Sequence, residues 1–292
     1  MKRFEYFAPA TLDGALSLLR ERGDGGKLLA GGTDLLVQMK EAGLHPSYVV
    51  SVRRLAELRG VSFSEAEGLR IGAMTDMATV AGHPVVRGRY RALFDGAGIV
   101  GSVQTRNMAT LGGNVCNAAP SADTAPPLVV LGAVAEIVGP QGRRTVPVQE
   151  LFSGPGQTVL SPTDILVAFH LPAPPPRSGG VYQRHTPRAI MDIAVVGVAA
   201  QVSLAPDGDV IREARICLGA VAPTPVRALE AEASLAGQAP SNEALARAAE
   251  LAVGAARPIS DVRGSAAFRR HLVRVMTERC LRIAVERARL VF

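Results

Sequence analysis

The sequence predicts a globular chain of mixed helices and strands, divided into two or three domains. Its 292 residues exceed one small domain, and a hydrophobic content of 48% supplies ample core material. Short apolar runs that are typical of strands alternate with segments of helical apolar spacing. A run of prolines at 172–176 marks a domain boundary, because proline disrupts both helices and central strands.

Composition and charge argue against several function classes. No uninterrupted apolar run reaches the roughly 18 residues that a membrane span needs, and the N-terminus has no apolar signal region, so we expect a cytoplasmic protein. The net charge is +6, but basic residues are scattered and aromatic residues make up only 4%. We therefore expect the positive charge to help bind an anionic cofactor, substrate or partner subunit, and not a nucleic acid. Three widely separated cysteines without a C-x-x-C motif predict no metal or iron–sulfur site in this chain.

The N-terminal region contains the first candidate ligand site. Thr11 can cap a helix that ends at Gly23. A short buried strand at 27–30 is followed by a glycine turn at 31–33 and a helix at 34–40. A strand, a glycine turn and a helix start can direct backbone donors at a phosphate. Two adjacent glycines alone more often form an ordinary tight turn.

A second stretch, 110–127, has almost no bulky side chains. It contains Gly112, Gly113, two asparagines, three prolines and Asp123. Glycines let backbone amides come close to a ligand, and small residues keep the space open. We therefore expect the two glycine segments to converge on one phosphate-bearing cofactor. An Asp beside such a segment can accept from a ribose hydroxyl or an adenine amine.

Outside the two glycine segments, apolar periodicity predicts a series of strands and helices. Further strands are expected at 48–52, 68–73, 135–138, 144–148 and 164–171, with helical segments at 53–58, 75–94 and 123–131. After the proline linker we expect strands at 180–183, 194–204 and 210–218, with a hairpin turn at 206–209, and helices at 230–235, 242–256 and 265–289. The last helix is amphipathic and is expected to pack across the small C-terminal sheet.

Common catalytic and nucleotide motifs are missing from the sequence. It contains neither a G-x-G-x-x-G that follows a strand, nor a G-x-x-x-x-G-K-[ST], nor a G-x-S-x-G. No catalytic acid, base or nucleophile stands out, so we predict no catalytic side chain.

Five segments in order resemble the FAD-binding medium subunit of molybdenum hydroxylases. This family includes the flavin subunits of bacterial xanthine dehydrogenase and aerobic carbon monoxide dehydrogenase. The matching segments are 29–35, 104–107, 110–114 with Pro120 and Asp123, 191–196, and 258–265. The resemblance extends over essentially the whole chain. Thr33 and Asp34 stand where carbon monoxide dehydrogenase relatives often have His and Ser, which favours the xanthine dehydrogenase branch.

The resemblance implies an α+β fold with an FAD-binding domain of the vanillyl-alcohol-oxidase (PCMH) type. This domain would cover 1–176, with subdomains at about 1–56 and 57–171. A smaller C-terminal domain, 177–292, would carry a three-stranded antiparallel sheet and helices. Asp192 and the segment 258–265 are expected to be structural, in interdomain or subunit contacts.

The resemblance also implies an FAD site. Two pyrophosphate segments, an acid on the adenosine side, a strand that lines the flavin and a basic residue near the flavin ring would hold the cofactor. These residues are, in that order, Lys27, Leu28, Leu29, Ala30, Gly31, Gly32, Thr33 and Asp34; Thr110, Leu111, Gly112, Gly113 and Asn114; Asp123; Ile165 and Leu166; and Arg184. For Ile165 and Leu166 a plain strand-core role stays open, and for Arg184 a surface position.

The implied function is electron transfer. FAD would take electrons from a [2Fe-2S] small subunit, which receives them from a molybdopterin large subunit, and pass them to NAD, a quinone or oxygen. A dimer of such heterotrimers is expected. Two alternatives stay open: a self-contained flavin oxidase or reductase of the same cofactor fold, and a non-enzymatic assembly module whose glycine segments are only turns.

Overall fold

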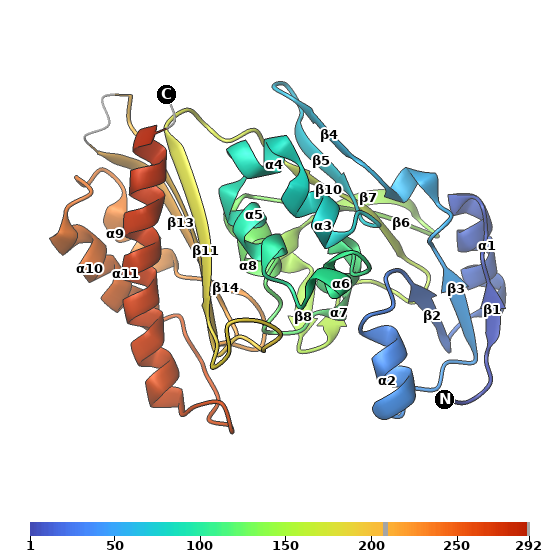
Figure 1. Cartoon of the computed structure of the whole chain (residues 1–292). Helices are drawn as coiled ribbons and strands as arrows, with labels where there is room; N and C mark the ends of the chain where they lie inside the picture. The colour runs from blue at the N-terminus through green and yellow to red at the C-terminus, as the bar shows by residue number, and fades with distance from the viewer. Residues whose placement is uncertain (207–209, 291–292) are drawn as a thin grey trace.

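Three larger β-sheets follow one another along the chain in the computed structural model, which describes residues 1–206 and 210–290 (Figure 1). A small two-stranded sheet of β8 (Phe152–Gly154) and β9 (Gln157–Thr158) falls in the same part of the chain as the second of them. The predicted hairpin turn at 206–209 therefore lies mostly outside the described residues. None of the helices in the described part of the chain is long and apolar enough to cross a membrane.

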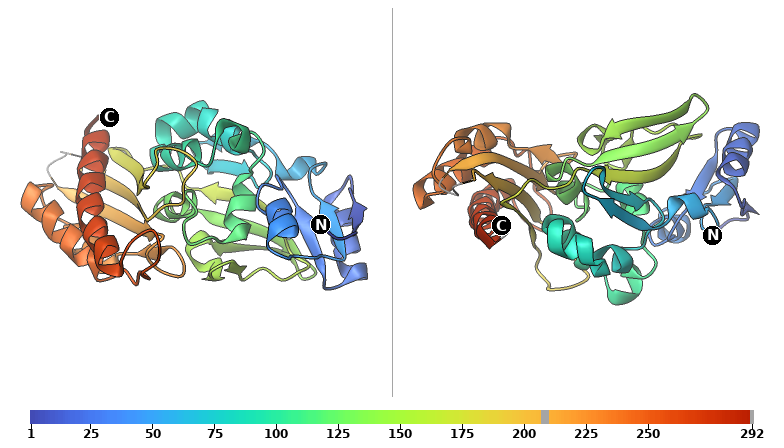
Figure 2. Two further views of the ribbon diagram at one scale, coloured as in Figure 1. Left: turned by 60° about the horizontal axis from the view of Figure 1, so that its bottom comes forward. Right: turned by 90° about the horizontal axis from the view of Figure 1, so that it is seen from above.

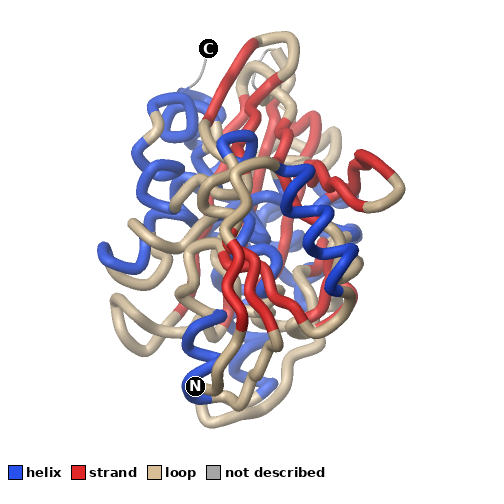
Figure 3. The backbone as a smooth tube through the Cα atoms, turned by 90° about the vertical axis from the view of Figure 1, so that its right-hand side faces the viewer, coloured by secondary structure: helices blue, strands red, loops and turns tan. Residues whose placement is uncertain are grey.

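The first sheet is parallel, with strand order β1-β3-β2. Its elements are β1 (Glu5–Phe7), α1 (Leu12–Arg22), β2 (Gly26–Leu29), α2 (Leu35–Glu41) and β3 (Tyr48–Ser51). Thr11 accepts a hydrogen bond from the amide of Gly14 and Gly23 ends α1, as predicted. Figure 3 looks onto this end of the molecule, where the three strands run side by side. Because the strands are parallel, β2 and β3 end at the same edge of the sheet.

The second sheet is antiparallel, with strand order β4-β5-β10-β6-β7. Its strands are β4 (Val61–Ser64), β5 (Gly68–Gly72), β6 (Val134–Gly139), β7 (Gly142–Pro147) and β10 (Ile165–Leu171). The remaining elements of this part are η1 (Ala56–Leu58), α3 (Met77–Gly82), α4 (Pro84–Arg89), α5 (Arg91–Gly98), α6 (Val103–Arg106), α7 (Leu111–Asn117), α8 (Ala125–Val130), η2 (Val148–Glu150), β8 (Phe152–Gly154) and β9 (Gln157–Thr158). Helices α5 and α8 pack against the third sheet, so one apolar core extends into the C-terminal part.

The third sheet contains four antiparallel strands, one more than predicted. The expected strands are β11 (Ser178–His185), β12 (Val196–Leu204) and β13 (Ile211–Gly219), and β14 (Val226–Arg227) pairs with β13. A strand of two residues is too short to show an alternating pattern. Helices α9 (Leu229–Leu235), α10 (Asn242–Val253) and α11 (Ala266–Leu290) follow. Helix α11 packs across β11 and β12, as expected, and Figure 2 shows it from two further directions.

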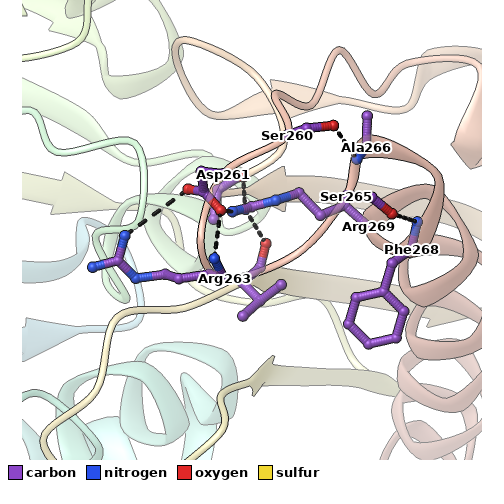
Figure 4. A network of polar contacts seen from close by, with 9 residues as sticks. Ser260, Asp261, Arg263, Ser265, Ala266, Phe268 and Arg269 are labelled. Atoms are coloured by element: carbon purple, nitrogen blue, oxygen red, sulfur yellow. Dashed lines mark hydrogen bonds and ion pairs between the residues drawn. The ribbon is translucent and has the colours of Figure 1, made fainter.

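The segment 258–265 is tied to the C-terminal sheet by Arg269, whose side chain is almost fully buried (Figure 4). Its Nη1 donates to the backbone oxygens of Val195 at 2.7 Å and Ala220 at 3.1 Å, and its Nη2 donates to Asp261 at 2.7 Å. These bonds all lie within the C-terminal part of the chain. They support the structural role predicted for the segment, and they fix the start of α11.

Candidate functional site

The two glycine-rich segments lie against each other. A Cβ atom placed on Gly31 would be 2.1 Å from the carbonyl oxygen of Met108 and 3.0 Å from the Cα atom of Ala109. A Cβ atom on Gly113 would be 3.7 Å from that of Ala30. Backbone approaches of this kind leave no room for a side chain at position 31. The structure thus brings the two segments together.

The first segment presents unpaired backbone donors. Within residues 1–206 and 210–290, no group accepts a hydrogen bond from the amides of residues 31–35. Gly32 has a φ of 82°, in the left-handed region that favours glycine. Asp34 precedes α2 without capping it through its side chain. Consecutive free amides at the start of a helix form an arrangement that binds phosphate groups.

The second segment is the start of helix α7 and not an open loop. Thr110 caps this helix, because its Oγ1 accepts from the amide of Gly113 at 3.1 Å. The amides of the other three residues donate to backbone oxygens as follows: Leu111 to Thr75, Gly112 to Ala73, and Asn114 to Thr110. In the described part of the chain, four of the five amides of this segment are therefore already bonded, and the amide of Thr110 alone has no acceptor. Its glycines instead allow close packing, on Ala73 and toward the first segment.

Arg53 holds the first segment in place and was missed from the sequence. Its Nε donates to the carbonyl oxygen of Ala30 at 2.9 Å, and its Nη2 donates to that of Gly31 at 3.0 Å. The residue follows β3, whose end lies at the same sheet edge as the end of β2. Only the parallel pairing of these strands reveals this proximity, and the sequence does not show that pairing. By fixing two carbonyl groups, Arg53 fixes the orientation of the free amides.

Replacement of Arg53 by lysine is expected to weaken FAD binding about tenfold. Lysine cannot hold two carbonyl groups with one planar fork, and each hydrogen bond contributes about 1 kcal/mol. A fluorescence titration of the flavin-free protein with FAD would measure the change. The variant Arg54→Lys, which alters the exposed neighbouring residue, is the matched control. Equal FAD affinity in the two variants would contradict this role of Arg53.

Asn114 connects the glycine segments to the acid that follows them. Its Oδ1 accepts a hydrogen bond of 2.6 Å from the hydroxyl of Thr124. In the described part of the chain its Nδ2 has no acceptor and stays available as a donor. Because Thr124 directly follows Asp123, this bond fixes the position of Asp123 relative to α7.

Asp123 binds two side chains of the C-terminal sheet. The hydroxyl of Tyr182 donates to Oδ1 at 2.9 Å, and Nη1 of Arg184 forms an ion pair with Oδ2. Burial raises the pKa of Asp123 to about 6, against the opposing effects of Arg184 and Tyr182. The Arg184 side chain is only 7% exposed, which excludes a surface position. Its Nη2 is buried and has no hydrogen-bond partner among the described residues.

Other predicted site residues lie in the cores beside these groups. Ile165 and Leu166 are buried on β10 and belong to two apolar clusters, as the strand-core alternative expected. Leu111 is fully buried, and Leu28 packs against the N-terminal core. Lys27 is exposed on β2. A direct contact of any of these residues with a cofactor stays a prediction.

The arrangement fits FAD. The free amides of residues 31–35 suit its pyrophosphate. A cleft lined by Ile99 and residues 182–189 lies beside Arg184 and offers a partly apolar wall for a flat ring. Arg184, whose guanidinium is permanently charged, forms part of the wall of this cleft. When bound, FAD would supply the redox chemistry, and the chain would supply binding and orientation.

Comparisons with known proteins match the chain along its length. The family described as the FAD binding domain in molybdopterin dehydrogenase matches residues 2–174, and the carbon monoxide dehydrogenase flavoprotein C-terminal domain matches 182–284. A putative xanthine dehydrogenase FAD-binding subunit of Escherichia coli is 38% identical over 97% of this chain and 96% of that protein. The carbon monoxide dehydrogenase medium chain of Hydrogenophaga pseudoflava is 34% identical over 97% of each chain.

Solved structures agree with these sequence matches. Carbon monoxide dehydrogenase from Hydrogenophaga pseudoflava superposes with a TM-score of 0.94 at 34% identity, covering 98% of each chain. Quinoline 2-oxidoreductase from Pseudomonas putida gives 0.91 at 30% identity, covering 99% of each chain. The predicted α+β fold and the predicted cofactor, FAD, are confirmed. The chain is an oxidoreductase subunit and belongs to the family of FAD-binding subunits of molybdenum hydroxylases.

Proposed function

We propose that this chain carries electrons through FAD inside a molybdenum-containing hydroxylase of the xanthine dehydrogenase type. A [2Fe-2S] small subunit delivers the electrons, and a molybdopterin large subunit oxidises the substrate. NAD, a quinone or oxygen then receives the electrons from FAD. A dimer of heterotrimers and a cytoplasmic location belong to the same proposal.

One observation carries this proposal: nearly the whole chain matches proteins named as subunits or medium chains of dehydrogenases. The match includes both the FAD-binding part and the C-terminal part, which correspond to the two parts of a flavin subunit and not to a substrate-covering domain. This argues against a self-contained flavin oxidase or reductase. The free amides of residues 31–35 argue against an assembly module in which the glycine segments are only turns.

The cysteines fit a partner that supplies the iron–sulfur cluster. Cys217 and Cys280 are buried, and burial raises the pKa of the Cys280 thiol to about 12. Cys116 is exposed. A [2Fe-2S] cluster held by cysteines alone needs four thiolates, and this chain has three cysteines.

For the FAD site we propose the residues that the sequence suggested, but two groups of them have a different role. Lys27 to Ala30 support the first segment instead of binding the pyrophosphate, and the segment 110–114 packs against it instead of offering a row of backbone donors. Residues 31–35 hold the pyrophosphate through their amides, and the segment 110–114 supplies close packing and the Asn114 side-chain donor. Lys27 to Leu29 support the first segment from β2, and Ala30 directly follows that strand. Ile165 and Leu166 line the floor of the site from β10.

Co-production of the chain with candidate [2Fe-2S] and molybdopterin subunits from the same organism tests the electron route. With xanthine as the first substrate, the flavin absorbance of the whole complex should bleach under anaerobic conditions. The FAD-loaded chain alone should stay oxidised. Bleaching by substrate in the isolated chain would contradict the proposal and favour a self-contained flavoenzyme.

A further inference from the structure

We infer that a hydrogen bond between Gln38 and Asn117 acts as a clasp that keeps the two glycine segments closed around FAD. The Nε2 atom of Gln38 donates to the Oδ1 atom of Asn117 at 3.1 Å, across 79 positions of sequence. The inference rests on the proposed function of the chain as an FAD subunit. It assigns these two residues a positioning role that neither a sequence motif nor the family resemblance suggested.

The clasp joins the two helices that carry the glycine segments. Helix α2 begins directly after Asp34, and helix α7 begins at Leu111 within the second segment. Residues three or four positions apart share a face of a helix. Gln38 thus lies one turn beyond Asp34 on α2. On α7, Asn117 likewise lies one turn beyond Asn114. The clasp is therefore one helical turn from the groups that flank the proposed pyrophosphate position.

Helix α7 is the firmly held side of the clasp. Leu111 and Val115 are fully buried in the large core that extends to the C-terminal sheet. Ala118, which directly follows the helix, is also buried, and its carbonyl oxygen accepts from the amide of Gly156 at 2.9 Å. Asn117 is thus presented from a fixed position.

Helix α2 is the loosely held side of the clasp. Met39 is its only buried residue, and Val37 and Lys40 are exposed. In the described part of the chain, the clasp is the one hydrogen bond or ion pair that connects α2 to another helix or strand. Elements with few buried apolar contacts open more easily than the rest of a fold. Movement of α2 away from α7 is therefore limited chiefly by Gln38.

The clasp and Arg53 hold the two ends of one short stretch. Arg53 fixes the carbonyl groups of Ala30 and Gly31 at its start, and Gln38 fixes α2 at its end. The amides of residues 31–35, which we propose to bind the pyrophosphate, belong to this stretch. Without the clasp, α2 can swing away from α7 while Arg53 still holds the start of the stretch. Opening of this kind would let FAD leave.

Loss of the clasp should change the rate of FAD release more than the stability of the fold. A hydrogen bond between two neutral amides makes a modest net contribution, equivalent to about a fivefold change in an equilibrium constant. Neither Gln38 nor Asn117 belongs to an apolar core, so replacing them removes no core packing. The flavin-free chain should therefore unfold at nearly the wild-type temperature.

The release of FAD from the loaded chain tests the clasp. After dilution, the fluorescence of free FAD reports the rate of release, and thermal unfolding of the flavin-free chain reports its stability. Gln38→Met keeps the length of the side chain but removes the donor, and it should release FAD about fivefold faster. Asn117→Ala removes the acceptor and should have the same effect. Gln141→Met, in the exposed turn between β6 and β7, is the matched control and should release FAD at the wild-type rate.

Two double variants show whether the bond itself is responsible. Gln38→Met/Asn117→Ala should release FAD no faster than either single variant, because both substitutions remove the same interaction. Gln38→Asn/Asn117→Gln exchanges the two side chains and preserves their combined length. This exchange should restore release to near the wild-type rate. Gln38→Asn alone shortens the clasp by one methylene group and should release FAD as fast as Gln38→Met.

Three results would overturn the inference. Release at the wild-type rate from both single variants would show that the bond does not hold FAD in place. Additive effects in the first double variant, or no restoration by the exchange, would show that the two residues act separately. If the flavin-free single variants unfold at a clearly lower temperature than the wild type, faster release reflects a general loss of stability. A wild-type chain that takes up no FAD would instead contradict the proposed function itself.

Discussion

Replacement of Gly31 by alanine is expected to lower the FAD affinity about 100-fold. The new methyl group would lie 2.1 Å from the carbonyl oxygen of Met108. That atom belongs to the backbone and cannot rotate away, so the two glycine segments must separate. Overpacking of this kind costs about 1–3 kcal/mol, and 1.4 kcal/mol corresponds to a tenfold change in affinity. Separation would also misplace the free amides of residues 31–35.

Titration with FAD and thermal unfolding of the flavin-free protein would together measure the effect. Gly88→Ala is the matched control, because Gly88 lies inside helix α4 and a Cβ atom there meets nothing within 4 Å. Alanine should stabilise that helix slightly. Retention of normal FAD affinity by Gly31→Ala would show that the contact between the segments does not shape the cofactor site.

Replacement of Gly113 by aspartate is expected to abolish FAD retention during purification. A Cβ atom at this position would lie 2.9 Å from Thr110 Oγ1, so the cap of α7 would be disturbed. The carboxylate would also stand beside Ala30 and the first segment. Two like charges about 4 Å apart repel each other by about 4 kcal/mol near a protein surface. The pyrophosphate would therefore be rejected by charge as well as by space.

Gly113→Asn separates the effect of charge from the effect of space on FAD binding, because asparagine has nearly the same size as aspartate and no charge. This variant should retain FAD weakly, with an affinity that lies between those of the aspartate variant and the wild type. The FAD released by denaturation, measured per mole of chain, gives the readout. If the Gly113→Asp variant retained a full complement of FAD, the segment 110–114 would not be part of the FAD site.

Much of the fold followed from local sequence signals. Thr11 and Gly23 predicted the ends of α1 because capping chemistry is local. The proline run before β11 predicted a break in regular structure for the same reason. The two glycine segments were found as candidate ligand sites, since small residues without packing value suggest close backbone approach. The assignment to FAD came from the resemblance to a family and not from spacing.

Features that depend on long-range pairing were missed. The glycines at the start of α7 have low helix propensity, but bonds to residues 73–75 stabilise the helix start. Arg53 reaches Ala30 only because β2 and β3 are parallel neighbours. Tyr182 binds Asp123 across 59 positions of sequence. No periodic pattern within one element can reveal such contacts.

The most direct test of the proposed site is a structure of the complex with FAD bound. The pyrophosphate should lie within hydrogen-bonding distance of the amides of residues 31–35, and the flavin ring should lie in the cleft lined by Ile99 and residues 182–189. A pyrophosphate located away from these amides would contradict the central claim that the first glycine segment holds it.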